Sequence, residues 1–328
     1  MMVWCVFMYW VLLVFLASLI STLVVTPIFI RRLMESGVTG HDIHKQDGTQ
    51  VAEMGGLAVV FGFSVGAFIA IPFVNGDLVS LFGAILTIML TGLIGICDDL
   101  FGIRQKYKAW LPIFAAIPLM ALQAGDHTMI VPFVGLVDFG VIYPLLFIPV
   151  GVAVLANATN MLAGYNGLEA GLGFITCSFI GVAGLIAGRP LVYVLMFAMA
   201  AACLGFLKYN RFPSRVFPGD VGTFTIGAAI AAAVIVGNME FVGVIASMPY
   251  IINGLITSFS VARGKPIQKF SRTENGILVP PERKYVTTLY FELERLFRLT
   301  EKELVHAIWL IGAAFGLLSL AVFMLIGM

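Results

Sequence analysis

The stretch TGLIGICDDLFGIRQKYK (residues 91–108) joins an apolar run to two adjacent aspartates, Asp98 and Asp99, and three basic residues follow them. The chain carries no charged side chain from Leu78 to the first of these aspartates, and about 20 apolar residues suffice to cross a bilayer as a helix. Charged groups are costly in hydrocarbon, so the aspartates are expected at the membrane surface. The stretch therefore predicts a membrane-spanning helix that ends in a charged functional surface.

The composition of the whole chain agrees with this prediction. Of 328 residues, 60% are hydrophobic and 11% charged, and the mean hydropathy is +1.02. A soluble domain would carry about a quarter charged residues, so the composition predicts a protein embedded in the lipid bilayer. The net charge of +1, without a basic soluble face, argues against a nucleic-acid partner. The cysteines lie in apolar segments without metal-ligand spacing and are expected to act as small apolar residues; they are Cys5, Cys97, Cys177 and Cys203.

Apolar runs of sufficient length predict an all-α integral membrane protein of about ten transmembrane helices, forming one domain over residues 1–328. The predicted spans are 3–30, 52–74, 78–98, 109–124, 138–157, 168–187, 190–207, 221–237, 239–260 and 304–326. The connections expected on the cytoplasmic side are about 31–53, 98–108, 157–168, 208–221 and 261–303.

The distribution of basic residues predicts the orientation. With these spans, all but one of the 19 Lys and Arg residues fall on the side of the five connections, and only Arg189 lies on the other. Because Lys and Arg are enriched in cytoplasmic loops, both termini are expected outside and the polar connections inside.

The last connection contains a predicted helix of its own. After Pro280 and Pro281, apolar residues recur at helical spacing among charged ones, which is typical of an amphipathic helix on the membrane surface. Thr300 and Glu303 have the spacing of a capping box at the start of the last span.

Polar residues gather at the cytoplasmic ends of the predicted spans, and they are Asp98, Asp99, Asn157, Asn160, Asn166, Glu169 and Asp220. A single aspartate at a helix end is commonly a solvated cap. Oxygen-bearing or cationic side chains in four cytoplasmic connections instead favour a shared site.

The second polar stretch is NATNMLAGYNGLEAG (residues 157–171). Asn157 and Asn160 lie one helical turn apart, and the glycines, Gly164 among them, allow a backbone to approach a ligand closely. Packing of small residues between helices also explains the glycines, but not the asparagines or Glu169.

The third polar stretch is NRFPSRVFPGDVGTF (residues 210–224), which Pro213 and Pro218 prevent from forming a regular helix. Asp220 is either the N-cap of the following span or a ligand for a cation. Arg211 and Arg215 either bind a phosphate or only anchor the topology.

Taken together, these side chains are the oxygen ligands that Mg²⁺ prefers, with Mn²⁺ as a substitute, and the cations that bind phosphate. No His/Cys cluster predicts zinc, no GxxxxGK[ST] a P-loop and no GxSxG a serine hydrolase. The site predicts phosphoryl transfer at the membrane surface.

The blocks ICDDLFGIRQKYK, NATNMLAGYNGLEAG and NRFPSRVFPGDVGTF, in this order, resemble those of the polyprenyl-phosphate N-acetylhexosamine-1-phosphate transferase family. Within it the chain is more similar to the archaeal and eukaryotic UDP-GlcNAc:dolichyl-phosphate GlcNAc-1-phosphate transferases than to the bacterial peptidoglycan enzyme. The resemblance implies transfer of HexNAc-1-phosphate, with GlcNAc as the leading sugar, from a UDP-sugar to polyprenyl or dolichyl phosphate, with release of UMP. Such a product would be the first lipid-linked sugar of a glycan pathway.

The resemblance also implies roles for individual residues. Asn160 and Asp220 match the ligands of Mg²⁺, and Asp98 and Asp99 match an aspartate pair whose first member either accepts a proton or attacks as a nucleophile. The remaining assignments are Lys108 and Lys45 to the lipid phosphate, and Asn166, Gly164, Glu53, Arg215 and Arg272 to the nucleotide sugar. The chain lacks the histidine motif that bacterial members carry in the last cytoplasmic loop, so the sugar assignment rests on the family analogy alone.

A transporter or a flippase for lipid-linked sugars is the alternative function. It is disfavoured because transporter sites lie near the membrane midplane, whereas these polar residues gather on one side. The short last loop favours a prokaryotic, archaeal cell membrane, with the ER membrane as the expected place of a eukaryotic member. A homodimer is left open.

Overall fold

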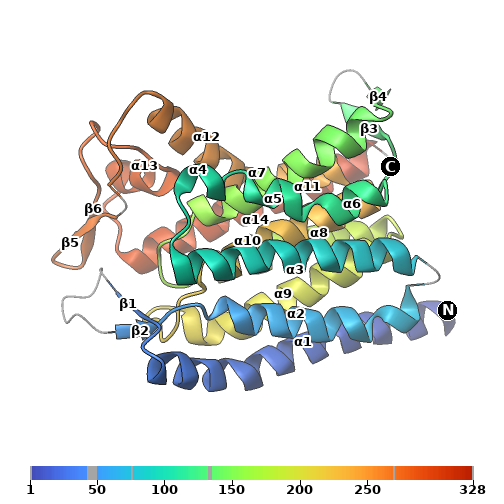
Figure 1. Ribbon diagram of the computed structural model, residues 1–328, viewed down its shortest axis with the longest axis horizontal. Coiled ribbons are helices and arrows are strands. Elements are labelled where there is room, and N and C mark those ends of the chain that lie inside the picture. The colour runs from blue at the N-terminus through green and yellow to red at the C-terminus, as the bar shows by residue number, and fades with distance from the viewer. Residues whose placement is uncertain (1, 43–49, 75–76, 132–134, 269, 327–328) are drawn as a thin grey trace.

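The computed structural model describes residues 2–42, 50–74, 77–131, 135–268 and 270–326, and it is a helical bundle with three small hairpins (Figure 1). The helices are α1 (Met2–Glu35), α2 (Gly56–Ile69), η1 (Ile71–Phe73), α3 (Leu78–Phe101), α4 (Gln105–Lys108), α5 (Leu111–Ala115), α6 (Ile117–Ala121), η2 (Tyr143–Phe147), α7 (Ile148–Met161), α8 (Leu168–Ile186), α9 (Pro190–Asn210), α10 (Gly219–Gly237), α11 (Glu240–Ala246), α12 (Met248–Ala262), α13 (Leu289–Leu296) and α14 (Glu301–Ile326). The antiparallel hairpins pair β1 (Thr39–His41) with β2 (Gln50–Ala52), β3 (Thr128–Val131) with β4 (Gly135–Asp138), and β5 (Arg272–Glu274) with β6 (Ile277–Val279).

The helices confirm an integral membrane protein. In the described part of the chain, 7 helices are long and apolar enough to cross a membrane, or 8 if α11 and α12, which meet at 69°, form one bent span. The predicted number of ten spans and the orientation stay predictions.

Three predicted spans differ in detail from the helices observed. The predicted span 52–74 contains α2, whose 14 residues cover about 21 Å, less than the roughly 30 Å of a hydrocarbon core. The span 109–124 consists of two five-residue helices, α5 and α6, each with a proline near its start. The span 239–260 bends between α11 and α12, where Pro249 lies in the first turn of α12. Proline lacks the N–H that continues a helix, which accounts for the last two differences.

The core of the bundle is α10, which is buried along most of its length and contacts α2, α3, α7 and α9. Its sequence is rich in Gly and Ala, and such small residues let neighbouring helices approach closely in a membrane. By contrast, α1 and α14 are largely exposed, and their outward side chains are apolar, as expected of surfaces that face lipid.

One end of the bundle collects the polar connections. Figure 1 shows β1, β2, β5, β6, α4 and α13 at the left end, while both chain termini lie at the right end. Termini at the same end require an even number of membrane crossings. Because β1, β2, β5, β6, α4 and α13 share one end of the bundle, polar segments that the sequence predicts to be cytoplasmic lie at the same end of the molecule.

The predicted amphipathic helix before the last span corresponds to α13. Thr288 caps it by accepting a hydrogen bond from the amide of Phe291 at 3.2 Å, and Leu296 and Phe297 at its far end are exposed. The predicted capping box is confirmed, since the Thr300 amide donates to the Glu303 carboxylate at 2.8 Å and the Glu303 amide donates to the Thr300 hydroxyl at 3.4 Å.

Candidate active site

The end of α3 holds Asp98 in a fixed position. Gly102 adopts a left-handed conformation (φ +65°) that ends the helix, and its amide donates to the carbonyl of Asp98 at 2.8 Å. This turn brings the amide of Ile103 to 2.6 Å from Oδ1 of Asp98. The carboxylate is buried and is oriented by the backbone that follows it.

Lys108 lies between two carboxylates. Its Nζ is 2.5 Å from Oδ2 of Asp98 and forms a second ion pair with Oδ2 of Asp220, which lies in the first turn of α10. Burial alone would lower the pKa of Lys108, but the charges of both aspartates and its hydrogen bonds to them raise the pKa above its usual value of 10.5. The ammonium group is therefore charged and links α3 to α10 through α4.

Asn160 completes this cluster from α7. Its side-chain amide donates to Oδ1 of Asp220 at 2.5 Å and to the hydroxyl of Thr223 at 2.9 Å. Thr159 on the same helix donates to the carbonyl of Thr223 at 2.9 Å, which fixes α7 against α10. The structure thus brings together four residues that the sequence predicted for one site: Asp98, Lys108, Asn160 and Asp220.

Asp99 faces a different partner from its neighbour. Its two carboxylate oxygens accept hydrogen bonds from the amides of Asp220 and Val221, at 2.8 and 3.0 Å. These amides belong to the first turn of α10, whose N–H groups have no partner within the helix. Asp99 therefore caps α10 from another helix, and the N-cap role that the sequence left open for Asp220 is wrong.

The loop between α7 and α8 carries Gly164 and Asn166. The amide of Gly164 donates to Glu169 at 2.8 Å, and the amide of Asn166 donates to Oε1 of Glu301 at 2.7 Å. The side chain of Asn166 also donates to Asp42 at 3.1 Å. Carboxylates therefore hold the backbone of this loop. Glu301 was not predicted as a site residue, because in the sequence it lies just before the last predicted span, far from the three polar stretches.

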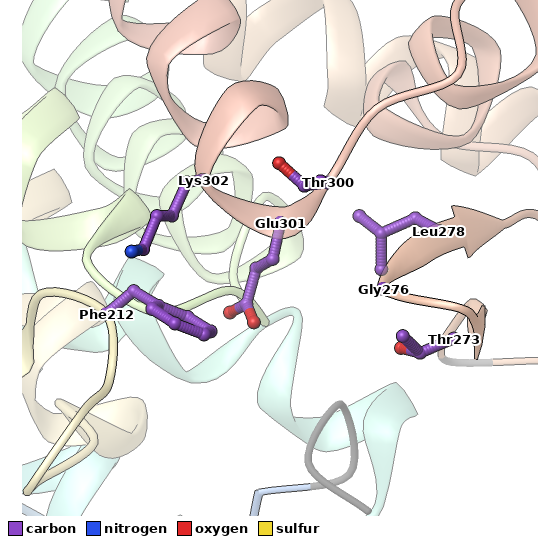
Figure 2. A pocket seen from close by; sticks show the side chains of 7 residues that line it. All are labelled: Phe212, Thr273, Gly276, Leu278, Thr300, Glu301 and Lys302. Atoms are coloured by element: carbon purple, nitrogen blue, oxygen red, sulfur yellow. The ribbon is translucent and has the colours of Figure 1, made fainter.

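A pocket of about 290 Å³ lies beside this loop (Figure 2). Glu301 and Lys302 extend toward Phe212, and Nζ of Lys302 is 4.8 Å from the centroid of the Phe212 ring. The pocket is lined by Phe212, Thr273, Gly276, Leu278, Thr300, Glu301 and Lys302.

The other predicted site residues lie around the cluster or apart from it. Burial and the negative charge of Asp220 raise the pKa of Glu53. The Glu53 carboxylate therefore lies close enough to Asp220 to interact with it electrostatically. Arg215 is exposed and stacks at 5.8 Å from the centroid of Tyr209, and Arg272 lies in β5 opposite Val279. Lys45 lies outside the described residues.

The donor set fits a hard cation that also binds a substrate. Carboxylates and a carboxamide are the ligands that Mg²⁺ prefers, and rotation of the Asn160 amide would present its oxygen in place of its nitrogen. Among the described residues, no three His, Cys, Asp or Glu side chains form a metal-binding group of their own. Such a site suits Mg²⁺, which usually takes one or two protein carboxylates and completes its shell with substrate phosphate and water.

These observations define an integral membrane protein whose helix ends assemble carboxylates, a carboxamide and an ammonium group, the chemistry of sites that handle phosphate. The chain belongs to glycosyl transferase family 4, whose model matches residues 81–238. The resemblance predicted from the three motifs is confirmed.

Two archaeal relatives match nearly the whole length of the chain, and a bacterial relative matches about three quarters of it. The chain is 31% identical to a Saccharolobus solfataricus protein called "Putative UDP-N-acetylglucosamine--dolichyl-phosphate N-acetylglucosaminephosphotransferase", over 94% of this chain and 95% of the relative. A Sulfolobus acidocaldarius protein of the same name is also 31% identical, with the same coverage. The "Probable undecaprenyl-phosphate N-acetylglucosaminyl 1-phosphate transferase" of Bacillus subtilis is 29% identical over 76% of this chain and 70% of its own.

Proposed function

We propose that this protein transfers HexNAc-1-phosphate, with GlcNAc-1-phosphate as the expected group, from a UDP-sugar to a polyprenyl or dolichyl phosphate. An oxygen of the lipid phosphate bonds to the β-phosphorus of the UDP-sugar, the bond from that phosphorus to the bridging oxygen breaks, and UMP leaves. The observation that carries the proposal is the cluster of Asp98, Lys108, Asn160 and Asp220 at the polar end of a membrane bundle. Names of the relatives at about 30% identity support the same reaction.

The charge of the cluster supports a divalent cation. Asp98, Asp99 and Asp220 carry three negative charges, and Lys108 offsets one of them. A diphosphate would be repelled by the remaining two, which Mg²⁺ would neutralise. Asp220 and Asn160 would hold the ion, and when bound it supplies charge neutralisation on the diphosphate and the leaving UMP.

We assign Asp98 to orientation of the lipid phosphate in its direct attack, or to proton acceptance from the fraction of that phosphate that arrives protonated. One of its oxygens accepts from the Ile103 amide and the other binds Lys108, which weakens the carboxylate as a nucleophile. The second pKa of a phosphate monoester is about 6, so the lipid phosphate is already largely ionised at neutral pH. Lys108 would orient that phosphate as it enters beside Asp98.

Asp99 is assigned a positioning role in this scheme. It holds the first turn of α10, and with it Asp220, by two hydrogen bonds to backbone amides. We place the site on the cytoplasmic face of an archaeal cell membrane, because the basic residues lie on the side of the polar connections and two archaeal relatives match 94% of the chain.

The test is product analysis with the full-length protein in nanodiscs. Polyprenyl phosphate, Mg²⁺ and a panel of UDP-HexNAc donors are supplied, with a chelator in a parallel sample. The proposal predicts one UMP per lipid product and no turnover in the chelator. UDP as the product would indicate ordinary glycosyl transfer. In a second sample with the protein in liposomes, substrate movement across the membrane without nucleotide release would indicate the transporter alternative.

A further inference from the structure

Three successive residues of the α7–α8 connection each donate a hydrogen bond to a buried carboxylate from a different helix. The amide of Gly164 bonds to Glu169 of α8 at 2.8 Å, and the amide of Asn166 bonds to Glu301 of α14 at 2.7 Å. Between them, the hydroxyl of Tyr165 donates to Oε1 of Glu294 of α13 at 2.6 Å. We call residues 162–167 the donor loop, because the family resemblance implies that Gly164 and Asn166 bind the nucleotide sugar.

Glu294 is an unusual residue for a helix on a membrane surface. It is only 5% exposed, whereas Glu292 two residues earlier is half-buried and pairs with Arg295. Burying a carboxylate costs free energy unless hydrogen bonds compensate for the lost water. Glu294 receives such bonds from Tyr165 and from the hydroxyl of Ser271, which directly precedes β5.

Helix α13 is also connected by hydrogen bonds, through Asn253 of α12, to α7, which carries Asn160. Asn253 of α12 is fully buried, and its side chain donates to the carbonyl of Met161 and accepts from the amide of Leu289, both at 2.9 Å. Met161 is the last residue of α7, and Leu289 is the first residue of α13. Asn253 therefore connects the start of α13 to Met161, the residue that follows Asn160 in α7. Glu294 lies less than two helical turns beyond Leu289.

We propose that Glu294 is a positioning residue for the nucleotide sugar: from α13 it holds Tyr165, and so fixes the donor loop and the Ser271 end of the β5–β6 hairpin around the donor. The inference rests on the proposed function, since that function makes the loop a donor site. Glu294 does not touch the reacting atoms in this account. Its loss should weaken donor binding and leave the lipid acceptor unaffected.

The test compares steady-state constants of four variants in nanodiscs. Tyr165→Phe removes only the hydroxyl, and we expect the KM for the UDP-sugar to rise roughly tenfold, with the KM for polyprenyl phosphate within about twofold of wild type. Glu294→Ala should do the same or more. Glu294→Gln should stay within about threefold, because its amide oxygen still accepts from Tyr165 and its nitrogen can donate to Ser271. Glu292→Gln is the matched control on the same helix and should change neither constant.

Hydrogen exchange separates this inference from the proposed function. Tyr165→Phe and Glu294→Ala should speed exchange of the amides in residues 162–167, and Glu292→Gln should not, whether or not the protein turns over any donor. An unchanged donor KM in Tyr165→Phe, or an equal rise in both KM values, would overturn the positioning role. If wild type forms no lipid product but the exchange differences appear, the proposed function fails while the coupling of Glu294 to the loop stands.

Discussion

Replacing Asp99 by Asn tests whether this residue positions the site. In the native protein its two oxygens accept from the amides of Asp220 and Val221 at 2.8 and 3.0 Å. Asparagine keeps one acceptor oxygen and puts an NH₂ group where the other oxygen was. One amide at the start of α10 then faces a donor, and the negative charge at the helix N-terminus is lost.

The magnitude follows from these two losses. A hydrogen bond to a charged group contributes about 1.5–3 kcal/mol, and a negative charge at a helix N-terminus contributes about 0.3–2 kcal/mol. We therefore expect Asp99→Asn to lower the free energy of unfolding by about 2–5 kcal/mol. Because the first turn of α10 carries Asp220, the Mg²⁺ concentration at half-maximal turnover should rise at least roughly tenfold.

The assay measures turnover over a Mg²⁺ titration together with thermal unfolding. Asp77→Asn is the matched control, because Asp77 caps the opposite end of α3 by accepting from the amide of Ser80 at 3.4 Å. That exposed cap is far from the site, and its loss should cost about 1 kcal/mol or less without changing the response to Mg²⁺. The positioning role is refuted if Asp99→Asn lowers turnover at saturating Mg²⁺ about 100-fold while its unfolding temperature and its Mg²⁺ concentration at half-maximal turnover match wild type, which would indicate a direct chemical role.

The remaining predictions address the contacts of α3 and α10. Asp98→Asn should reduce kcat about 100-fold or more, and no phosphorylated protein should be trapped; near-native turnover or a phospho-aspartate at this residue would contradict direct attack. Gly95→Ala would place its Cβ 2.6 Å from the carbonyl of Asp220, so we expect a loss of about 1–3 kcal/mol in stability and reduced turnover, whereas Gly151→Ala, with its nearest neighbour at 3.9 Å, should be nearly neutral by both measures. The folded-state pKa of Lys108 is raised above its usual value of 10.5. The stability that the charged ammonium group contributes is therefore complete below about pH 10.5 and is lost as the pH rises through the folded-state pKa. The difference in unfolding temperature between wild type and Lys108→Gln should accordingly shrink at high pH, and a constant difference would show that the charge of the ammonium group is not what stabilises the fold.

The residues of the central cluster could be predicted because their chemistry is visible locally. Asp98, Asn160 and Asp220 end or begin apolar segments, and oxygen-bearing groups at that position are expensive unless they serve a site. Their convergence follows from topology, since alternate ends of successive spans meet on one side of a membrane. The ion pairs of Lys108 with both aspartates required the structure, because the sequence only suggested that this lysine faces phosphate.

The role of Asp99 could not be predicted from the sequence. Its partners lie 121 and 122 residues further along the chain, so no local pattern distinguishes it from Asp98. Glu294 was missed for a similar reason, because a glutamate in an amphipathic helix is normally on the solvated face. In the structure, Glu294 is buried and accepts hydrogen bonds from Tyr165 and Ser271.

The span prediction was most accurate where one long apolar helix crosses the bundle, as in α3, α9 and α10. It was least accurate at residues 109–124 and 239–260, where hydropathy is high but the helices are broken. Hydropathy measures the preference for lipid and not the continuity of a helix. A hydropathy window therefore does not detect the helix breaks at prolines such as Pro112, Pro118 and Pro249.

The most direct test of the central claim uses UDP-GlcNAc labelled in both the sugar and the β-phosphate, with polyprenyl phosphate as the acceptor. The account predicts that both labels reach the lipid in equal amounts and that UMP is the nucleotide released. A lipid that carries the sugar label without the phosphate label, with UDP released, would contradict it.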